Sequence, residues 1–230
     1  MDINEFLLGA SVWVLPVLLA VTLHEAAHAY AARLLGDDTA SKLGRVSLNP
    51  AKHIDPFGTI LLPSMLIFIG SPFILGWAKP VPVVFGRLNN PKRDMIFVAL
   101  AGPASNILIA LIAAFGFAVF GLVPDVAADW VGQNLENAIK INLMLAVFNM
   151  LPIPPLDGGR VLTGLLPTSL AIPFSRLEKY GMIILIGLIF VLPMIGRQIG
   201  MDLNLISYVI IESIHAMLPF FQAIANLNII

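Results

Sequence analysis

The chain has 230 residues, of which 58% are hydrophobic and only 12% are charged, and its mean hydropathy is +0.91. An average soluble domain carries about twice this share of charged residues, so the composition excludes an ordinary soluble enzyme and predicts an integral membrane protein. The net charge of −1 gives no sign of a nucleic-acid partner, and the absence of cysteine excludes disulfides and cysteine-ligated metal sites. We expect a single membrane domain over residues 1–230.

The first apolar run, residues 6–32, is long enough to cross a hydrocarbon core of about 30 Å as a helix. Pro16 lies inside it and is expected to kink that helix. The residues before the run are acidic, unlike the basic start of a signal peptide, so we expect the run to be retained. Basic residues follow from Arg33 onward. This bias predicts an external N-terminus and a cytoplasmic Arg33.

A His-Glu-x-x-His motif lies within this apolar run, at residues 24–28. On a helix, His24 and His28 are one turn apart and share a face, so both imidazoles can bind one Zn²⁺. Glu25 is placed beside them to act on water at the metal rather than on the metal. The alternative is a pair of core histidines bonded to backbone carbonyls, but it leaves a carboxylate at membrane depth unexplained.

The next run, 57–77, is apolar but interrupted by prolines and glycines, and residues 78–87 alternate prolines with valines. That alternation excludes a helix and predicts extended chain or an edge strand. A full span over 57–77 would place the basic residues of 79–93 outside. We therefore expect a short re-entrant, extended β-like segment around 57–87. Residues 81–85 either pair with an unwound substrate or form a plain structural strand.

Four more apolar runs follow along the chain. The first two are separated by an acidic stretch, 124–137, which contains no Lys or Arg and is expected to be an outer loop. With the first run, they predict an all-α polytopic membrane protein with about five to six membrane segments. The runs are 95–123, 138–156, 181–196 and 203–230.

A tetrahedral zinc site with two histidines requires a third protein ligand and one open position. The candidates in or beside later apolar runs are Asp157, Glu212 and His215. Asp157 is preferred, because the prolines of 152–155 stop the preceding helix and the two glycines after Asp157 allow a tight turn. An ordinary turn aspartate is the alternative. Glu212 and His215 share a helix face and favour a hydrogen-bonded structural pair between helices.

Three motifs in this order resemble the site-2 protease family of intramembrane zinc metalloproteases. They are the motif at 24–28, Gly-Pro-Ala-Ser-Asn at 102–106, and the segment 149–159, which follows the pattern Asn-x-x-Pro-x-x-Pro-Leu-Asp-Gly. Residues 44–50 and 76–83 are also similar to the compact prokaryotic members. The stretch 124–137 is too short for the PDZ domain that larger members carry.

The resemblance implies one zinc ion per chain, held by His24, His28 and Asp157, with Glu25 as the catalytic residue. It also implies that Asn106 and Asn149 help to position substrate or to polarise the scissile carbonyl.

We therefore expect a zinc-dependent endopeptidase of the cell membrane. It would hydrolyse peptide bonds within or next to transmembrane helices of membrane-protein substrates, with its active site toward the cytoplasm. One alternative is a metal-binding membrane transporter or a catalytically inactive scaffold. Another is a membrane zinc protease that cuts juxtamembrane segments, in which Glu212 would replace Asp157 as third ligand.

Overall fold

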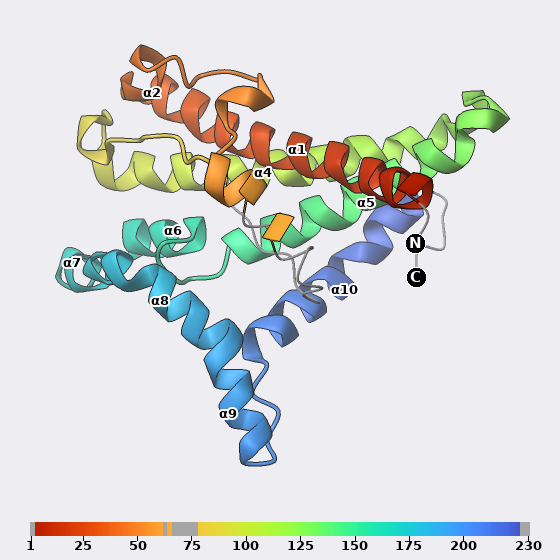
Figure 1. Cartoon of the computed structure of the whole chain (residues 1–230). Coiled ribbons are helices and arrows are strands. Elements are labelled where there is room, and N and C mark those ends of the chain that lie inside the picture. Colours follow the sequence, from red (N-terminus) through yellow and green to blue (C-terminus); the bar gives the residue numbers. More distant parts are fainter. Residues whose placement is uncertain (1–2, 62–63, 66–77, 226–230) are drawn as a thin grey trace.

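The computed structural model describes residues 3–61, 64–65 and 78–225, and this part of the chain is helical with irregular connections and no strand (Figure 1). Part of the stretch predicted to be re-entrant, at 62–63 and 66–77, lies outside the described residues. The elements are α1 Ile3–Leu34, α2 Thr39–Lys42, η1 Pro50–Lys52, η2 Pro56–Leu61, η3 Phe85–Arg87, α4 Pro91–Ala118, η4 Phe120–Leu122, α5 Asp125–Asn149, α6 Asp157–Leu165, α7 Thr168–Ser175, η5 Arg176–Tyr180, α8 Gly181–Ile186, η6 Gly187–Val191, α9 Leu192–Gln198 and α10 Leu205–Ala225.

Among the described residues, 4 helical segments are long and apolar enough to cross a membrane: 8–34 within α1, α4, the continuous run 168–198, and α10. The helix α5, 25 residues long, lies alongside α1 and α4 and carries more charge. These helices confirm the predicted all-α, multi-pass membrane protein.

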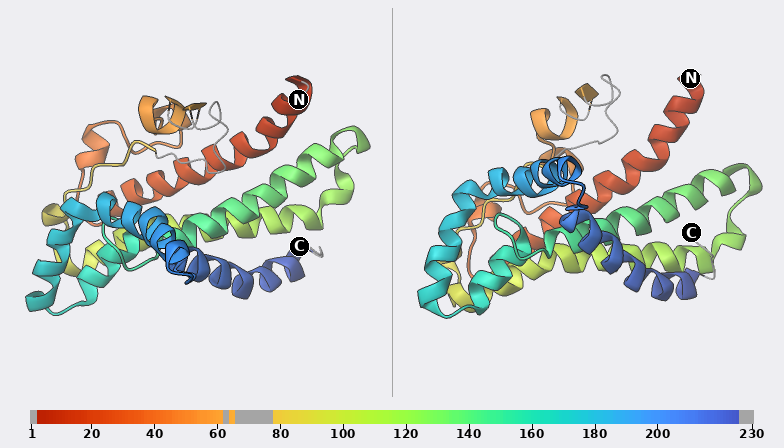
Figure 2. Two further views of the ribbon diagram at one scale, coloured as in Figure 1. Left: turned by 60° about the horizontal axis from the view of Figure 1, so that its bottom comes forward. Right: turned by 90° about the horizontal axis from the view of Figure 1, so that it is seen from below.

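Three long helices, α1, α4 and α5, run side by side and form the body of the molecule (Figures 1 and 2). The helix α10 packs against α4 and α5, whereas α8, α9 and the adjoining part of α10 extend away to a tip at 199–204. Three alanines of α4 (110, 113 and 114) meet Ile139 and Leu143 of α5 and Phe221 of α10 in a buried cluster. Small residues let membrane helices approach closely, which explains the alanine-rich face.

Pro16 lies inside α1, as the sequence indicated, and it removes the N–H that would bond to the Val12 carbonyl. The Asn137 side-chain amide of α5 donates to that carbonyl at 3.0 Å. In a membrane a freed backbone group must find a partner inside the protein, and this bond supplies one.

The loop predicted at 124–137 is wrong, because residues 125–137 form the first half of α5, whereas their place on the outer side stays a prediction. The stretch is polar, but its polar side chains have helical partners. The Asn134 amide donates to the Trp130 carbonyl at 2.8 Å, and the Trp130 indole donates to the Ser11 hydroxyl at 2.9 Å. A polar stretch can therefore continue a helix when neighbouring helices bond to it.

Residues 78–84 are extended, as predicted, but they pair with no strand in the described part of the chain. Their N–H groups bond to the protein instead: that of Lys79 donates to the His53 carbonyl at 2.9 Å, and that of Val84 donates to the Asp37 carboxylate at 2.6 Å. Burial disfavours the Asp37 anion, but hydrogen bonds from Thr39 and Val84 outweigh this effect and lower the pKa of Asp37. The segment is therefore tied down against the end of α1.

Candidate metal centre

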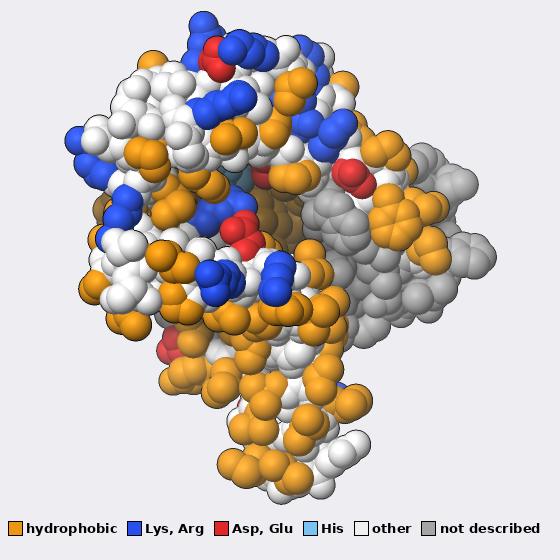
Figure 3. Space-filling view, turned by 90° about the vertical axis from the view of Figure 1, so that its left-hand side faces the viewer, with side chains coloured by type: hydrophobic (Ala, Val, Ile, Leu, Met, Phe, Trp, Pro, Cys, Tyr) orange, Lys and Arg blue, Asp and Glu red, His pale blue; other side chains and the backbone are white. Residues whose placement is uncertain are grey.

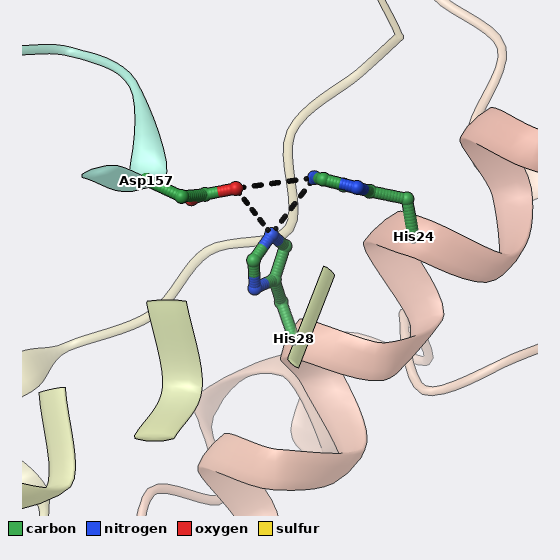
Figure 4. Close-up of side chains that lie close together, drawn as sticks. All are labelled: His24, His28 and Asp157. Carbon is green, nitrogen blue, oxygen red and sulfur yellow. Dashed lines mark hydrogen bonds and ion pairs between the residues drawn. The ribbon is translucent and has the colours of Figure 1, made fainter. Parts of the chain in front are cut away.

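Three donor atoms from α1 and α6 converge on one point (Figure 4). The Nε2 atoms of His24 and His28 are 3.0 Å apart, and each lies close to Asp157 Oδ2, at 3.3 and 3.2 Å. All three side chains are buried, with exposed fractions of 7%, 8% and 4%. The sequence placed the two histidines on one helix face, and the fold brings the start of α6 to that face.

The outer nitrogen of each imidazole is occupied by a hydrogen-bond acceptor. His28 Nδ1 lies 2.7 Å from the Val98 carbonyl, which can only accept, so Nδ1 carries the proton. His24 Nδ1 lies 2.6 Å from Asn106 Oδ1, which imposes the same tautomer. Both rings therefore direct the Nε2 lone pair toward the carboxylate of Asp157.

These three donors fit a zinc ion. Ligands at about 2.0–2.1 Å from a tetrahedral Zn²⁺ are separated by about 3.3 Å, close to the donor spacing in this structure. The convergence favours a cation, because two lone pairs and a carboxylate oxygen face one another and Asp157 Oδ2 has no hydrogen-bond donor among the described residues. Two histidines, one carboxylate and an open fourth position form the ligand set of a catalytic zinc site.

Gly102 of α4 leaves the space in which the histidines stand. A Cβ at this position would lie 2.4 Å from His28 Nε2 and 2.6 Å from His24 Nε2. Any side chain at 102 would therefore push the donors apart. One turn later, Asn106 reaches His24, so the motif at 102–106 both clears the site and orients one of the three donor side chains.

Asp157 is the first residue of α6, and the chain around it explains its position. The sequence suggested that the two following glycines allow a tight turn, but both are helical and serve close packing instead. A Cβ on Gly158 would lie 2.2 Å from the Met150 carbonyl oxygen, and one on Gly159 would lie 2.6 Å from the Pro154 nitrogen. The glycines therefore let the start of α6 press against the proline-rich turn that follows α5.

Arg160 places a positive charge near the second oxygen of the Asp157 carboxylate. Its Nη1 lies 3.7 Å from Asp157 Oδ1, and its Nη2 donates to Glu178 Oε1 at 3.0 Å. The guanidinium carbon also lies 5.5 Å from the centre of the Phe85 ring. Arg160 thus connects α6 with the chain at 85 and at 178, a contact that the sequence did not predict.

Glu25 projects from the same helix as the histidines but contributes no atom to the donor group. Its Oε2 accepts the Val81 backbone N–H at 2.7 Å, so the extended segment 78–84 passes beside the carboxylate. Glu25 is half-buried, so its carboxylate is not sealed off from solvent.

The other residues singled out in the sequence lie in different surroundings. Asn106 is fully buried and bonded to His24, so its contacts give no support to the predicted substrate role. Asn149 is half-buried at the end of α5, where its amide donates to the Leu145 carbonyl at 3.0 Å, and its substrate role stays a prediction. Glu212 and His215 are exposed on α10 and do not belong to the donor group.

Comparisons with known proteins indicate a zinc metalloprotease. The model of peptidase family M50 matches residues 123–192. A Bacillus subtilis protein named "Putative zinc metalloprotease YwhC" is 40% identical over 185 residues, which cover 79% of this chain and 80% of the relative. A Mycolicibacterium smegmatis protein named "Putative zinc metalloprotease Rip2" is 28% identical over 201 residues, covering 85% and 71%. No solved structure matches the chain.

Proposed function

The chain belongs to peptidase family M50, the site-2 protease family of zinc metalloproteases, and from this premise we propose that it cleaves membrane-protein substrates within or next to their transmembrane helices. The observation that carries the proposal is the convergence of three buried donors beside helices long enough to span a membrane. His24, His28 and Asp157 hold the zinc ion in this proposal, and the whole chain, 1–230, acts as one membrane domain.

Bound in this group, zinc supplies Lewis acidity, which lowers the pKa of water from about 15.7 to about 7. Glu25 accepts the proton of the attacking water while the water oxygen bonds to the peptide carbonyl carbon. When the carbon–nitrogen bond breaks, Glu25 returns the proton to the leaving amine. Asn149 is the last residue of α5, at the start of the turn that leads to Asp157. We assign to it the polarisation of the substrate carbonyl.

The substrate passes beside the extended segment 78–84. Val81 already donates its N–H to Glu25, and Pro80 and Pro82 have no N–H, so the outer edge of this segment offers carbonyl acceptors in place of a full ladder. An unwound substrate helix has free N–H groups that can donate to those carbonyls. We therefore assign this segment a one-sided form of strand pairing, weaker than the β-augmentation of a complete strand.

We assign the active site to the cytoplasmic side of the cell membrane. The charge distribution supports this choice, because Lys and Arg gather on the face that Figure 3 views, which is hollowed at its centre. Basic residues favour cytoplasmic loops. By sequence, most of the Lys and Arg residues of the chain fall in three stretches, 33–52, 79–93 and 160–179.

Removal of any one proposed ligand should remove zinc. We expect His24→Ala, His28→Ala and Asp157→Ala each to lower the zinc content of the purified protein to a small fraction of one per chain, because a two-ligand site is weak. Glu212→Ala is the matched control, a carboxylate removed from an exposed position. The measurement is the zinc content per chain of each purified variant. Zinc lost in Glu212→Ala and kept in Asp157→Ala would transfer the third ligand to Glu212.

Cleavage should depend on how easily the substrate helix unwinds. A reporter transmembrane helix with Gly near its cytoplasmic end should be cut faster than the same helix with Ala there. One Gly→Ala change restores about 1 kcal/mol of helix preference, which corresponds to about a fivefold loss of rate if unwinding precedes the slow step. The assay compares purified enzyme on both reporters in bilayers. Equal rates, or faster cutting of a soluble unstructured peptide, would contradict intramembrane cleavage.

A further inference from the structure

We propose that Asn142 is a positioning residue for the metal centre: acting through Asn106, it fixes which nitrogen of His24 faces the metal. The proposal rests on the assignment of His24 as a zinc ligand. Asn142 itself touches none of the three donor side chains, and nothing in its sequence context sets it apart from the other asparagines of α5.

The starting observation is a pair of amide side chains buried completely between three helices. Asn106 of α4 and Asn142 of α5 both have an exposed fraction of 0%. Asn106 Nδ2 donates to Asn142 Oδ1 at 2.7 Å, and Asn142 Nδ2 donates to the Ala138 carbonyl at 2.8 Å. Burial of two amides in an apolar bundle costs free energy unless each polar group is bonded, and here both are bonded.

The orientation of each side chain in this series of hydrogen bonds follows from its last acceptor, the Ala138 carbonyl. The Ala138 carbonyl can only accept, so the Asn142 NH₂ must face it and the Asn142 oxygen must face Asn106. Asn106 then points its own NH₂ at Asn142 and its oxygen at His24 Nδ1, which must carry the proton. His24 is left with its lone pair on Nε2, the atom in the donor group.

A second acceptor contributes to the same outcome. Asn106 Nδ2 also lies 3.3 Å from the Ala20 carbonyl of α1, a longer contact than the 2.7 Å bond to Asn142. Without Asn142, the NH₂ group of Asn106 would be held by this longer bond alone. The flipped amide would present NH₂ to His24 Nδ1, which favours the tautomer with its proton on Nε2, and that tautomer cannot bind a metal through Nε2.

The same helix provides a matched control. Asn137 is also buried, at 8% exposure, and its amide also bonds to another helix, donating to the Val12 carbonyl of α1 at 3.0 Å. No hydrogen bond links Asn137 to the metal donors in the described part of the chain. Asn137→Leu and Asn142→Leu therefore make the same chemical change on the same helix, and only one of them breaks the connection to His24.

The experiment measures zinc affinity of full-length protein in detergent by competition with a chelator, together with the melting temperature of the metal-free protein. Outer groups that orient ligands are worth about 10–100-fold in metal affinity, so we expect a loss of this size in Asn142→Leu and none in Asn137→Leu. Equal affinities in Asn142→Leu and the native protein would overturn the inference, as would equal losses in both Leu variants. His24→Ala separates the two proposals: unchanged zinc in that variant would refute the ligand assignment itself.

A conservative variant supplies the second readout. In Asn142→Asp, burial favours the neutral acid, which has one carbonyl and one O–H and so the same acceptor and donor pattern as the amide. Neutral or ionised, the Asp side chain presents an oxygen that accepts the Asn106 NH₂, so the ratio of its zinc affinity to that of native protein at the same pH should stay near one. Affinity as weak as that of Asn142→Leu at every pH would contradict the orienting role.

Discussion

Replacement of Glu25 by Gln should abolish proteolysis and leave zinc bound. Glu25 contributes no atom to the donor group, so the three proposed ligands are untouched. The Gln side chain keeps an oxygen that can accept the Val81 N–H, so the segment 78–84 also keeps its contact. What is lost is the ability to take up and return a proton. General acid–base catalysis is worth about 10²–10⁴-fold, so we expect a fall in the cleavage rate of at least this size.

The measurement is cleavage of a reporter transmembrane helix by purified enzyme, with zinc content determined on the same preparation. Glu136→Gln is the control, because this carboxylate pairs with Lys140 on α5 and lies outside the donor group. It should cleave at the native rate. Near-native turnover by the Glu25 variant would remove the residue from the mechanism. Zinc bound by a native protein that cleaves no reporter would instead favour the transporter or scaffold.

Gly102→Ala should remove the metal as completely as loss of a ligand. The added methyl carbon would lie 2.4 Å from His28 Nε2, which is much shorter than a van der Waals contact between carbon and nitrogen. Both histidines must then move away from Asp157, and the donor spacing that fits zinc is lost. Ala is a better helix former than Gly by about 1 kcal/mol, so a weaker helix cannot be the cause. We expect near-zero zinc content and no cleavage.

Gly187→Ala makes the same change where a Cβ meets nothing within 4 Å. It should retain zinc and activity, so the pair separates the effect at the site from the effect of the substitution. Full zinc occupancy in Gly102→Ala would mean that zinc binding does not depend on the present positions of the two histidines beside α4. Melting temperatures of both variants establish that the comparison concerns folded protein.

The sequence predicted the parts of the site whose geometry is local. His24 and His28 lie on one helix, so their spacing alone sets their shared face. Asp157 could be selected because the prolines before it and the glycines after it mark a break in a membrane run. The glycines serve close packing rather than a turn, however. The contact of Gly158 with the Met150 carbonyl depends on how α6 packs, and no local pattern encodes that contact.

The parts that the sequence did not predict depend on tertiary contacts. The Val98 carbonyl orients His28, and a backbone acceptor leaves no signal in a sequence. Asn142 resembles any polar residue of a helix until α4 is placed beside it. The first half of α5 was predicted as a loop from its polarity, because its bonds to α1 and within the helix appear only in the fold.

The gap that Pro16 opens in α1 concerns how the protein is made. A membrane chain is synthesised and inserted from its N-terminus, so α1 enters the bilayer with the Val12 carbonyl unpaired until Asn137 follows. Likewise, His24 of α1 has no contact with Asn106 of α4, and later none with Asp157, until each of these residues has been synthesised. An unfinished chain therefore holds an incomplete donor set, and the three donor atoms meet only after Asp157 has been synthesised and the bundle has closed.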